Sequence, residues 1–234
     1  MLRVKTHIVT PFEQNARILL EEEQKCGVII DPGGDVDLLF MLAEPKKYNI
    51  ESILLTHCHI DHGGGVKQLL KCFELHQLPI PKLYYHSEDE VIGQNIESYA
   101  AAVGLSPQLY QNVPKADQWL DNQSVFKIGD LTSQVLFVPG HSPGHIALYF
   151  ETIKTSLSGQ FSEPTQERPI LIGGDTLFRE SIGRADLPMA DYPTLMTSIK
   201  LKLLKLPDDT LVLPGHGENT SIGYEKKFNP FLQN

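Results

Sequence analysis

Three histidines and an aspartate stand within six residues of one another, directly after a short apolar run. The segment reads Thr56-His57-Cys58-His59-Ile60-Asp61-His62, and residues 52–55 precede it. Because His57 and His59 alternate along an extended backbone, their rings project to the same side. Imidazole and carboxylate groups are ligands that suit Zn, Mn or Fe. The segment therefore predicts a strand that ends in a metal-binding loop, with three glycines that allow a tight turn into the next helix.

Polar groups follow three further expected strands in the same way. Residues 134–138 run into Pro139-Gly140-His141, residues 169–172 into Gly173-Gly174-Asp175, and residues 210–213 into Pro214-Gly215-His216. Other strands are expected at 16–20, 27–30 and 82–85, and helices at 37–43, 66–75, 88–103 and 192–206. Strands interleaved with helices predict an α/β sandwich whose strand ends gather their polar side chains at one edge.

The chemistry that such a cluster favours is hydrolysis. Two ions about 3.5 to 4 Å apart can hold a bridging water, lower its pKa towards 7 and stabilise a developing oxyanion. A metal-bridging hydroxide needs no Ser or Cys nucleophile. Six of the nine histidines lie in strand-end, glycine-rich contexts: His57, His59, His62, His141, His145 and His216. We expect the other three, His7, His76 and His86, to be surface or packing residues.

The length and composition of the chain are typical of one globular domain. The 234 residues are 41% hydrophobic and 21% charged, which predicts a single domain over residues 1–234. The polar stretch 151–168 is the exception, and we expect an exposed loop or a hairpin extension there. No apolar run approaches the length of a bilayer span, so we expect a cytoplasmic protein without a membrane partner.

Charge and cysteine content exclude other classes. A formal net charge of -9 argues against a nucleic-acid surface, which relies on clustered Lys and Arg. The three cysteines, Cys26, Cys58 and Cys72, are an odd number without framework spacing, so we expect no disulfide scaffold and a reducing compartment. The partner that remains is a small-molecule substrate, and the oligomeric state is left open.

The histidine segment and the three later strand ends resemble the signature of the metallo-β-lactamase family. The resemblance extends from about residue 10 to residue 232 and implies that family's fold, a four-layer αβ/βα sandwich. It also implies two divalent ions, Zn first with Fe or Mn as alternatives. One ion would be held by His57, His59 and His141, the other by Asp61, His62 and His216, with Asp175 bridging the two. In this scheme Asp61 and Asp175 position the bridging hydroxide.

Other segments are similar to glyoxalase II and, more closely, to short glyoxalase II-like hydrolases. They are Thr-Pro-Phe-Glu-Gln-Asn at 10–15, Ile-Asp-Pro-Gly-Gly at 30–34, Ser-Ile-Gly-Arg-Ala-Asp-Leu-Pro at 181–188, Ile-Gly-Tyr-Glu at 222–225 and Asn-Pro-Phe at 229–231. The resemblance implies cleavage of a thioester such as S-D-lactoylglutathione.

The glutathione-recognition elements of glyoxalase II are altered in this sequence. Arg184 stands where a lysine is expected, so it is a candidate to bind a substrate carboxylate, or else it pairs with a neighbour such as Asp186. Asp186 replaces an expected tyrosine. Only 18 residues follow His216, too few for the helical glutathione-binding domain. We therefore expect a more open, less selective thioesterase site.

Three further residues are candidates to support the ligands. Asp31 is placed to accept a hydrogen bond from a ligand imidazole, or simply to cap the turn that follows it. The Thr56 hydroxyl is placed to brace the loop, and His145 either supports a ligand or packs. Residues 94–118 form a pocket wall or merely pack.

Two other functions remain compatible with the sequence. A persulfide dioxygenase-like oxidoreductase uses the same fold with a single iron, and His57, His141 and Asp175 could supply its ligands. A non-enzymatic or nucleic-acid-processing member of the superfamily is the third possibility. The full ligand set argues against a dead scaffold, and the acidic balance argues against a nuclease.

Overall fold

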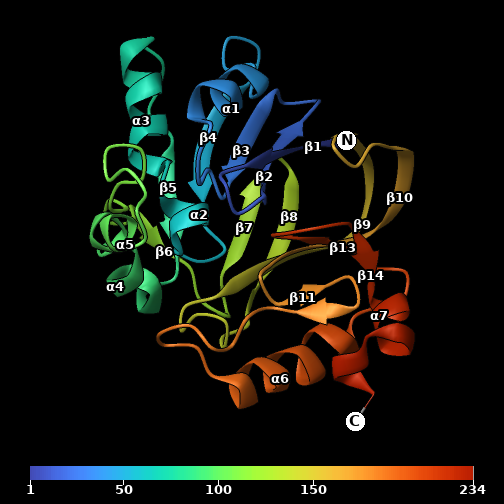
Figure 1. Ribbon diagram of the computed structural model, residues 1–234. Helices are drawn as coiled ribbons and strands as arrows, with labels where there is room; N and C mark the ends of the chain where they lie inside the picture. Colours follow the sequence, from blue (N-terminus) through green and yellow to red (C-terminus); the bar gives the residue numbers. More distant parts are fainter. Residues whose placement is uncertain (234) are drawn as a thin grey trace.

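The computed structural model describes residues 1–233 and shows one continuous sheet folded into two halves (Figure 1). In the first half the strands lie in the order β1-β2-β3-β4-β5-β6. Their bounds are β1 Leu2–Val9, β2 Gln14–Glu21, β3 Cys26–Ile30, β4 Asn49–Leu54, β5 Lys82–Tyr85 and β6 Gln118–Trp119. The first three strands pair antiparallel, and β3 to β6 pair parallel.

The second half has the order β7-β8-β9-β10-β13-β14. Its strands are β7 Val125–Ile128, β8 Leu131–Phe137, β9 Ile146–Gly159, β10 Glu163–Gly174, β13 Leu211–Pro214 and β14 Thr220–Ser221. β11 (Leu177–Phe178) and β12 (Ser181–Ile182) form a separate pair. The polar stretch 151–168 lies in the β9–β10 hairpin, where β9 also pairs with β1 in the register Leu2↔Thr155. This hairpin joins the two halves and covers an edge of β1 that would otherwise be open.

Helices cover the outer face of each half. They are α1 Val36–Leu42, α2 Ile60–Gly63, α3 Val66–Leu75, α4 Glu90–Gly93, α5 Ile96–Ala102, α6 Tyr192–Leu201 and α7 Ile222–Phe228, with 3-10 turns η1 Ser87–Asp89, η2 Leu203–Lys205 and η3 Pro230–Leu232. In Figure 1, α1 and α3 lie on the side opposite α6 and α7. No helix among the described residues is long and apolar enough to cross a membrane.

Three apolar clusters hold these layers together. In β2, Ile18 packs towards α1 and α3, whereas its neighbour Leu19 packs between the two sheet halves, as the two-residue period of a strand requires. Phe73 of α3 joins the first cluster, and Leu195 of α6 joins the third against the second sheet half. Full burial of such side chains contributes about 1.5–3 kcal/mol each. The order helices, sheet, sheet, helices confirms the predicted αβ/βα sandwich.

The region 88–103, predicted as one helix, is broken in the structure. Asp89 lies in η1, α4 ends at Gly93, and α5 begins at Ile96. A Cβ at Gly93 would lie 3.1 Å from Val113 Cβ and 3.3 Å from Cys58 Cβ. A larger residue would therefore fit tightly there, and glycine is a poor helix former. The sequence analysis also missed β1, although its alternation of apolar and polar residues is typical of a half-buried strand, and it missed α7, which has only seven residues.

Candidate metal centre

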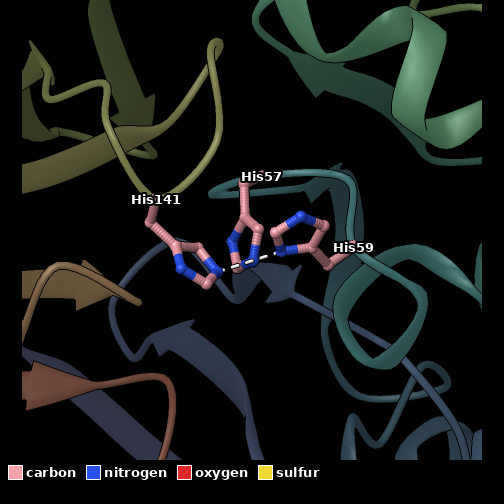
Figure 2. Close-up of side chains that lie close together, drawn as sticks. All are labelled: His57, His59 and His141. Atoms are coloured by element: carbon pink, nitrogen blue, oxygen red, sulfur yellow. Dashed lines mark hydrogen bonds between the residues drawn. The ribbon is translucent and has the colours of Figure 1, made fainter. Parts of the chain in front are cut away.

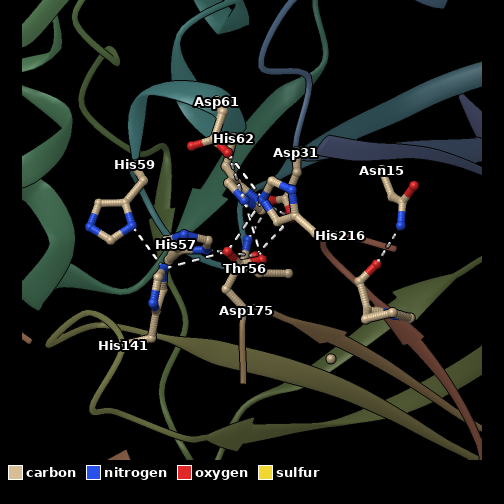
Figure 3. A network of polar contacts seen from close by, with 12 residues as sticks. Asn15, Asp31, Thr56, His57, His59, Asp61, His62, His141, Asp175 and His216 are labelled. Atoms are coloured by element: carbon tan, nitrogen blue, oxygen red, sulfur yellow. Dashed lines mark hydrogen bonds and ion pairs between the residues drawn. The ribbon is translucent and has the colours of Figure 1, made fainter. Parts of the chain in front are cut away.

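The carboxyl ends of five strands meet at one edge of the sandwich. Asp31 follows β3, His57 follows β4, and Asp175 follows β10; His141 and His216 lie in the loops after β8 and β13. All seven predicted ligands therefore come together at this edge, with Asp31 and Thr56 beside them (Figure 3). The exposed or outlying His7, His76 and His86 belong to none of the groups that could hold a metal among the described residues.

His57, His59 and His141 form the first group of candidate ligands (Figure 2). Their ligand atoms lie within 4.8 Å of one another, and His59 Nδ1 is 2.9 Å from His141 Nε2. His59 precedes α2, where an extended backbone turns its ring towards the other two. Three imidazole nitrogens converging in this way match the ligand set of a bound transition metal.

Asp61, His62 and His216 form the second group, and Asp175 lies between the two groups. His216 Nε2 is 3.1 Å from Asp61 Oδ2 and 3.4 Å from Asp175 Oδ2. The same oxygen also faces the first group, because Oδ2 lies 3.5 Å from His141 Nε2, whereas Oδ1 lies 3.4 Å from His62 Nε2. Asp175 is therefore placed to contact ions in both positions.

Hydrogen bonds from Asp31 and Thr56 determine which ring nitrogens face the centre. Asp31 Oδ1 accepts from the Thr56 backbone N–H at 2.7 Å, and Oδ2 accepts from the Thr56 hydroxyl at 2.7 Å and from His62 Nδ1 at 3.0 Å. Since the Thr56 hydroxyl donates to Asp31, its oxygen accepts from His57 Nδ1 at 3.1 Å. The Nε2 lone pairs of His57 and His62 consequently point into the centre.

His141 and His145 are oriented in a similar way by backbone groups. His141 Nδ1 lies 2.8 Å from the Arg184 carbonyl oxygen, to which it donates, so its Nε2, which faces His59 Nδ1 at 2.9 Å, is an acceptor. His145 Nε2 accepts from the Asp175 backbone N–H at 2.9 Å, and its ring stacks on His57 with centroids 4.8 Å apart. His145 thus supports Asp175 and His57 rather than joining the ligand groups.

The charges at the centre are arranged to receive cations. Burial, reinforced by neighbouring histidines, holds the pKa of His57 well below its usual value and lowers that of His59 to about 3. Although burial opposes ionisation, His62 and His216 hold the pKa of Asp175 well below its usual range. Neutral His57 and His59 beside an ionised Asp175 are in the state that metal binding requires. Although burial opposes the shift, Asp175 and Asp61 raise the pKa of His62 well above its usual value and that of His216 to about 9, so these two rings would release a proton when a metal binds.

Unpartnered atoms provide a direct test of whether the residues fit a metal. His57 Nε2, His62 Nε2 and Asp175 Oδ1 are buried without a hydrogen-bond partner in residues 1–233. His62 Nε2 and Asp175 Oδ1 face each other at 3.4 Å. Leaving such groups unsatisfied costs about 1–3 kcal/mol each. Metal coordination would satisfy all three, so the residues fit the divalent ions that the sequence predicts.

Two glycines permit the close approach of the loops that carry these ligands. A Cβ at Gly33 would lie 1.5 Å from the Asp61 carbonyl oxygen. A Cβ at Gly215 would lie 2.0 Å from Asp175 Oδ1. Any other residue would therefore displace a candidate ligand.

Three residues that the sequence reading did not single out support this edge. Asn15 Nδ2 donates to the carbonyl oxygens of Pro214 and Gly217, at 3.1 and 2.9 Å, on both sides of the candidate ligand His216. Asn15 belongs to the motif quoted for residues 10–15, so its motif offered a signal.

No sequence motif pointed to the other two residues, Asp89 and Arg17. Buried Asp89 accepts from the backbone N–H groups of Cys58 and Gly144, at 2.7 and 2.5 Å, and so ties two ligand loops together. Arg17 is 2% exposed, and burial lowers its pKa to about 10 although Asp31 and Asp175 oppose the shift. It remains positive near neutral pH and offsets part of the acidic charge.

The centre opens into a cavity of about 530 Å³. Part of its apolar lining comes from α4 and α5 and consists of Val91, Ile92, Ile96 and Tyr99, the α4–α5 wall. A second part consists of Leu187, Pro188 and Met189, the Leu187–Met189 wall. Within the predicted 94–118 region, Ile96 and Tyr99 thus line the cavity, whereas Tyr110 and Val113 pack in the core.

Arg184, the predicted substrate-binding residue, lies on this cavity, and its guanidinium is paired with Asp186. Its Nε and Nη2 donate to Oδ1 and Oδ2 of Asp186 at 2.9 and 3.0 Å. Both side chains are mainly exposed. The expected ion pair between Arg184 and Asp186 is therefore present in the structure. Substrate binding by Arg184 stays a prediction.

Comparison with known proteins shows a likeness along almost the whole chain. Residues 10–159 and 150–216 match a family model described as the metallo-beta-lactamase superfamily. The hydroxyacylglutathione hydrolase GloC of Haemophilus influenzae is 36% identical over 226 residues, covering 96% of this chain and 95% of that protein.

Two solved structures share the fold. The B3 metallo-beta-lactamase BLEG-1 superposes with a TM-score of 0.80 at 32% identity, covering 99% of this chain and 100% of the other. TTHA1623 in a di-iron-bound form superposes with a TM-score of 0.76 at 35% identity, covering 97% and 99%. The shared fold thus extends over nearly the full length of each chain.

Proposed function

The chain belongs to the metallo-beta-lactamase superfamily, and from that premise we propose that it is a metal-dependent hydrolase of thioesters such as S-D-lactoylglutathione. The observation that carries the proposal is the convergence of two three-residue ligand groups on Asp175. The likeness to the hydrolase GloC supports a thioester as the substrate.

The residues present would hold two ions. His57, His59 and His141 would bind one ion, and Asp61, His62 and His216 the other, with Asp175 in contact with both. When bound, such ions lower the pKa of a coordinated water and polarise the substrate carbonyl. Zn suits these ligands, and the di-iron form of TTHA1623 makes iron a candidate as well.

The side chains then have separate tasks. Asp61 and Asp175 face the same space and orient the attacking water by accepting its hydrogen bonds. Asp31 and Thr56 keep the protons of His57 and His62 on Nδ1, so that Nε2 of each ring stays available. A thiol with a pKa of about 8.5 leaves as the thiolate, so this cleavage needs no proton donor beside the sulfur.

The test is hydrolysis of S-D-lactoylglutathione by protein stripped of metal and then reloaded with Zn, Mn or Fe(II). We expect activity only after reloading, and we expect His59→Ala to abolish it because one ligand group is broken. His76→Ala is the matched control, since His76 is exposed at the end of α3. Normal hydrolysis by stripped protein or by His59→Ala would refute the proposal.

A second assay separates the oxidoreductase alternative. His57, His141 and Asp175 are the ligands that this alternative would use, and His141 Nε2 is 3.5 Å from Asp175 Oδ2, but the three together are not among the groups of described residues whose ligand atoms lie within 4.8 Å of one another. The second group of ligands favours two ions and hydrolysis. Oxygen consumption with glutathione persulfide, together with one iron per chain, would decide for the oxidoreductase.

A further inference from the structure

The cavity walls beside the candidate metal centre are apolar. Four of the side chains that line the cavity are large hydrophobic groups left open to solvent: Phe12, Val91, Tyr99 and Met189 are 42%, 49%, 46% and 55% exposed. Large apolar side chains gathered around one opening are typical of a ligand-binding surface rather than of ordinary surface composition. The walls therefore offer a binding surface to an apolar group.

The walls carry little charge to recognise a polar substrate. Apart from the candidate ligands, Arg184 is the one charged residue among the described residues that line the cavity. Its guanidinium is already paired through two nitrogens with Asp186. A glutathione thioester carries two carboxylates, and the cavity supplies no unpaired cation to match them.

The two walls are also held in place before any substrate binds. Gly93 at the end of α4 packs against Val113 and Cys58, and Ile96 at the start of α5 is buried in the core. At the Leu187–Met189 wall, the Asp191 backbone N–H donates to the Gly140 carbonyl oxygen at 2.7 Å, which anchors the loop just after Met189. A preformed apolar slot binds its ligand without a further ordering cost.

We propose that the preferred substrates of this site are thioesters that carry an unbranched apolar group several carbons long, bound between the α4–α5 wall and the Leu187–Met189 wall. This inference rests on the proposed thioester hydrolysis. The apolar group lies on either the acyl or the thiol side of the scissile C–S bond, and hydrolysis consumes water and releases a carboxylic acid and a thiol in both cases.

Two substrate series distinguish the sides. In one, glutathione thioesters carry lactoyl, 2-hydroxybutanoyl, 2-hydroxyhexanoyl and 2-hydroxyoctanoyl groups; in the other, the lactoyl group is fixed and glutathione is replaced by unbranched alkanethiols of rising length. Each methylene buried against the walls is expected to raise kcat/KM up to about fourfold. The series in which kcat/KM rises with chain length identifies the side of the scissile C–S bond that carries the apolar group.

Variants at exposed wall positions test whether the walls cause the preference. Val91→Ser and Met189→Ser should each lower the ratio of kcat/KM for long over short substrates about threefold or more. Val103→Ser is the matched control, because Val103 is 47% exposed and lies outside the cavity lining. It should leave the ratio unchanged.

The outcomes separate this inference from the function on which it rests. If lactoylglutathione is hydrolysed in a metal-dependent way but neither series rises by more than twofold, the apolar preference is wrong and the proposed function stands. The apolar preference is also wrong if the ratio of kcat/KM for long over short substrates is unchanged in Val91→Ser and Met189→Ser. If no thioester in either series is cleaved, the proposed function itself fails.

Discussion

Replacing Asp31 by asparagine perturbs the proton arrangement of the metal centre with the smallest possible change in volume. Asp31 is 3% exposed, and its two oxygens accept three hydrogen bonds, two from Thr56 and one from His62. Asparagine keeps one acceptor oxygen and places an NH₂ donor at the other position. If the NH₂ lies at the Oδ1 position, the buried Thr56 backbone N–H loses its acceptor. If the NH₂ lies at the Oδ2 position, this donor group faces the Nδ1–H donor of His62.

Either orientation leaves one buried donor unsatisfied, which costs about 1–3 kcal/mol. If the molecule avoids that cost by moving the proton of His62 to Nε2, a ligand atom is lost. We therefore expect metal affinity to fall about 10- to 100-fold, or about 1.4 to 2.8 kcal/mol.

The assay is competition between the protein and a chelator of known affinity, with Asp130→Asn on the exposed β7–β8 turn as the control. Unchanged metal affinity in Asp31→Asn would refute the argument that Asp31 sets the ring protons. A fall of equal size in the control would show that the effect is one of net charge alone.

Two further substitutions test how the loops are held. Gly215→Ala places a Cβ 2.0 Å from Asp175 Oδ1 and should lower kcat/KM at least about tenfold, whereas Gly173→Ala, whose nearest atom would be 3.5 Å away, should be mild. Equal activities would contradict the close-approach argument. Burial raises the pKa of Asp89 from 3.8 to about 6, so the folded protein keeps a proton that the unfolded chain releases. The contribution of Asp89 to the free energy of unfolding should thus fall as the pH rises from about 4 to about 6. Urea unfolding of the wild type and Asp89→Asn across this range measures it, and parallel pH profiles would refute the shift.

The parts of the fold that follow from local pattern were predictable from the sequence. An apolar run followed by Gly or Pro and then His or Asp marks a strand end, because such residues stop a strand and tolerate a tight turn. That pattern pointed to His141, Asp175 and His216, and the fold brings them to His57. Their role as ligands remains a prediction, but their convergence is a property of the structure.

Features that depend on tertiary contacts were out of reach. The break in the helix follows Gly93, which packs closely against Val113 and Cys58, and these two residues are distant in sequence. Asp89 looked like an ordinary helical acid, yet it ties together two ligand loops that come from different strands. Arg17 lies in an apolar strand, and nothing local shows that it is buried near Asp31. Each role depends on contacts between segments that are distant in the sequence.

The measurement that tests the central claim most directly is metal titration of the stripped protein, with bound metal and S-D-lactoylglutathione hydrolysis followed in the same samples. The two ligand groups predict that full activity is reached at two ions per chain and that His216→Ala, which breaks the second group, retains one ion and loses most activity. Full hydrolysis at one ion per chain, or an unchanged His216→Ala variant, would contradict a two-metal hydrolase.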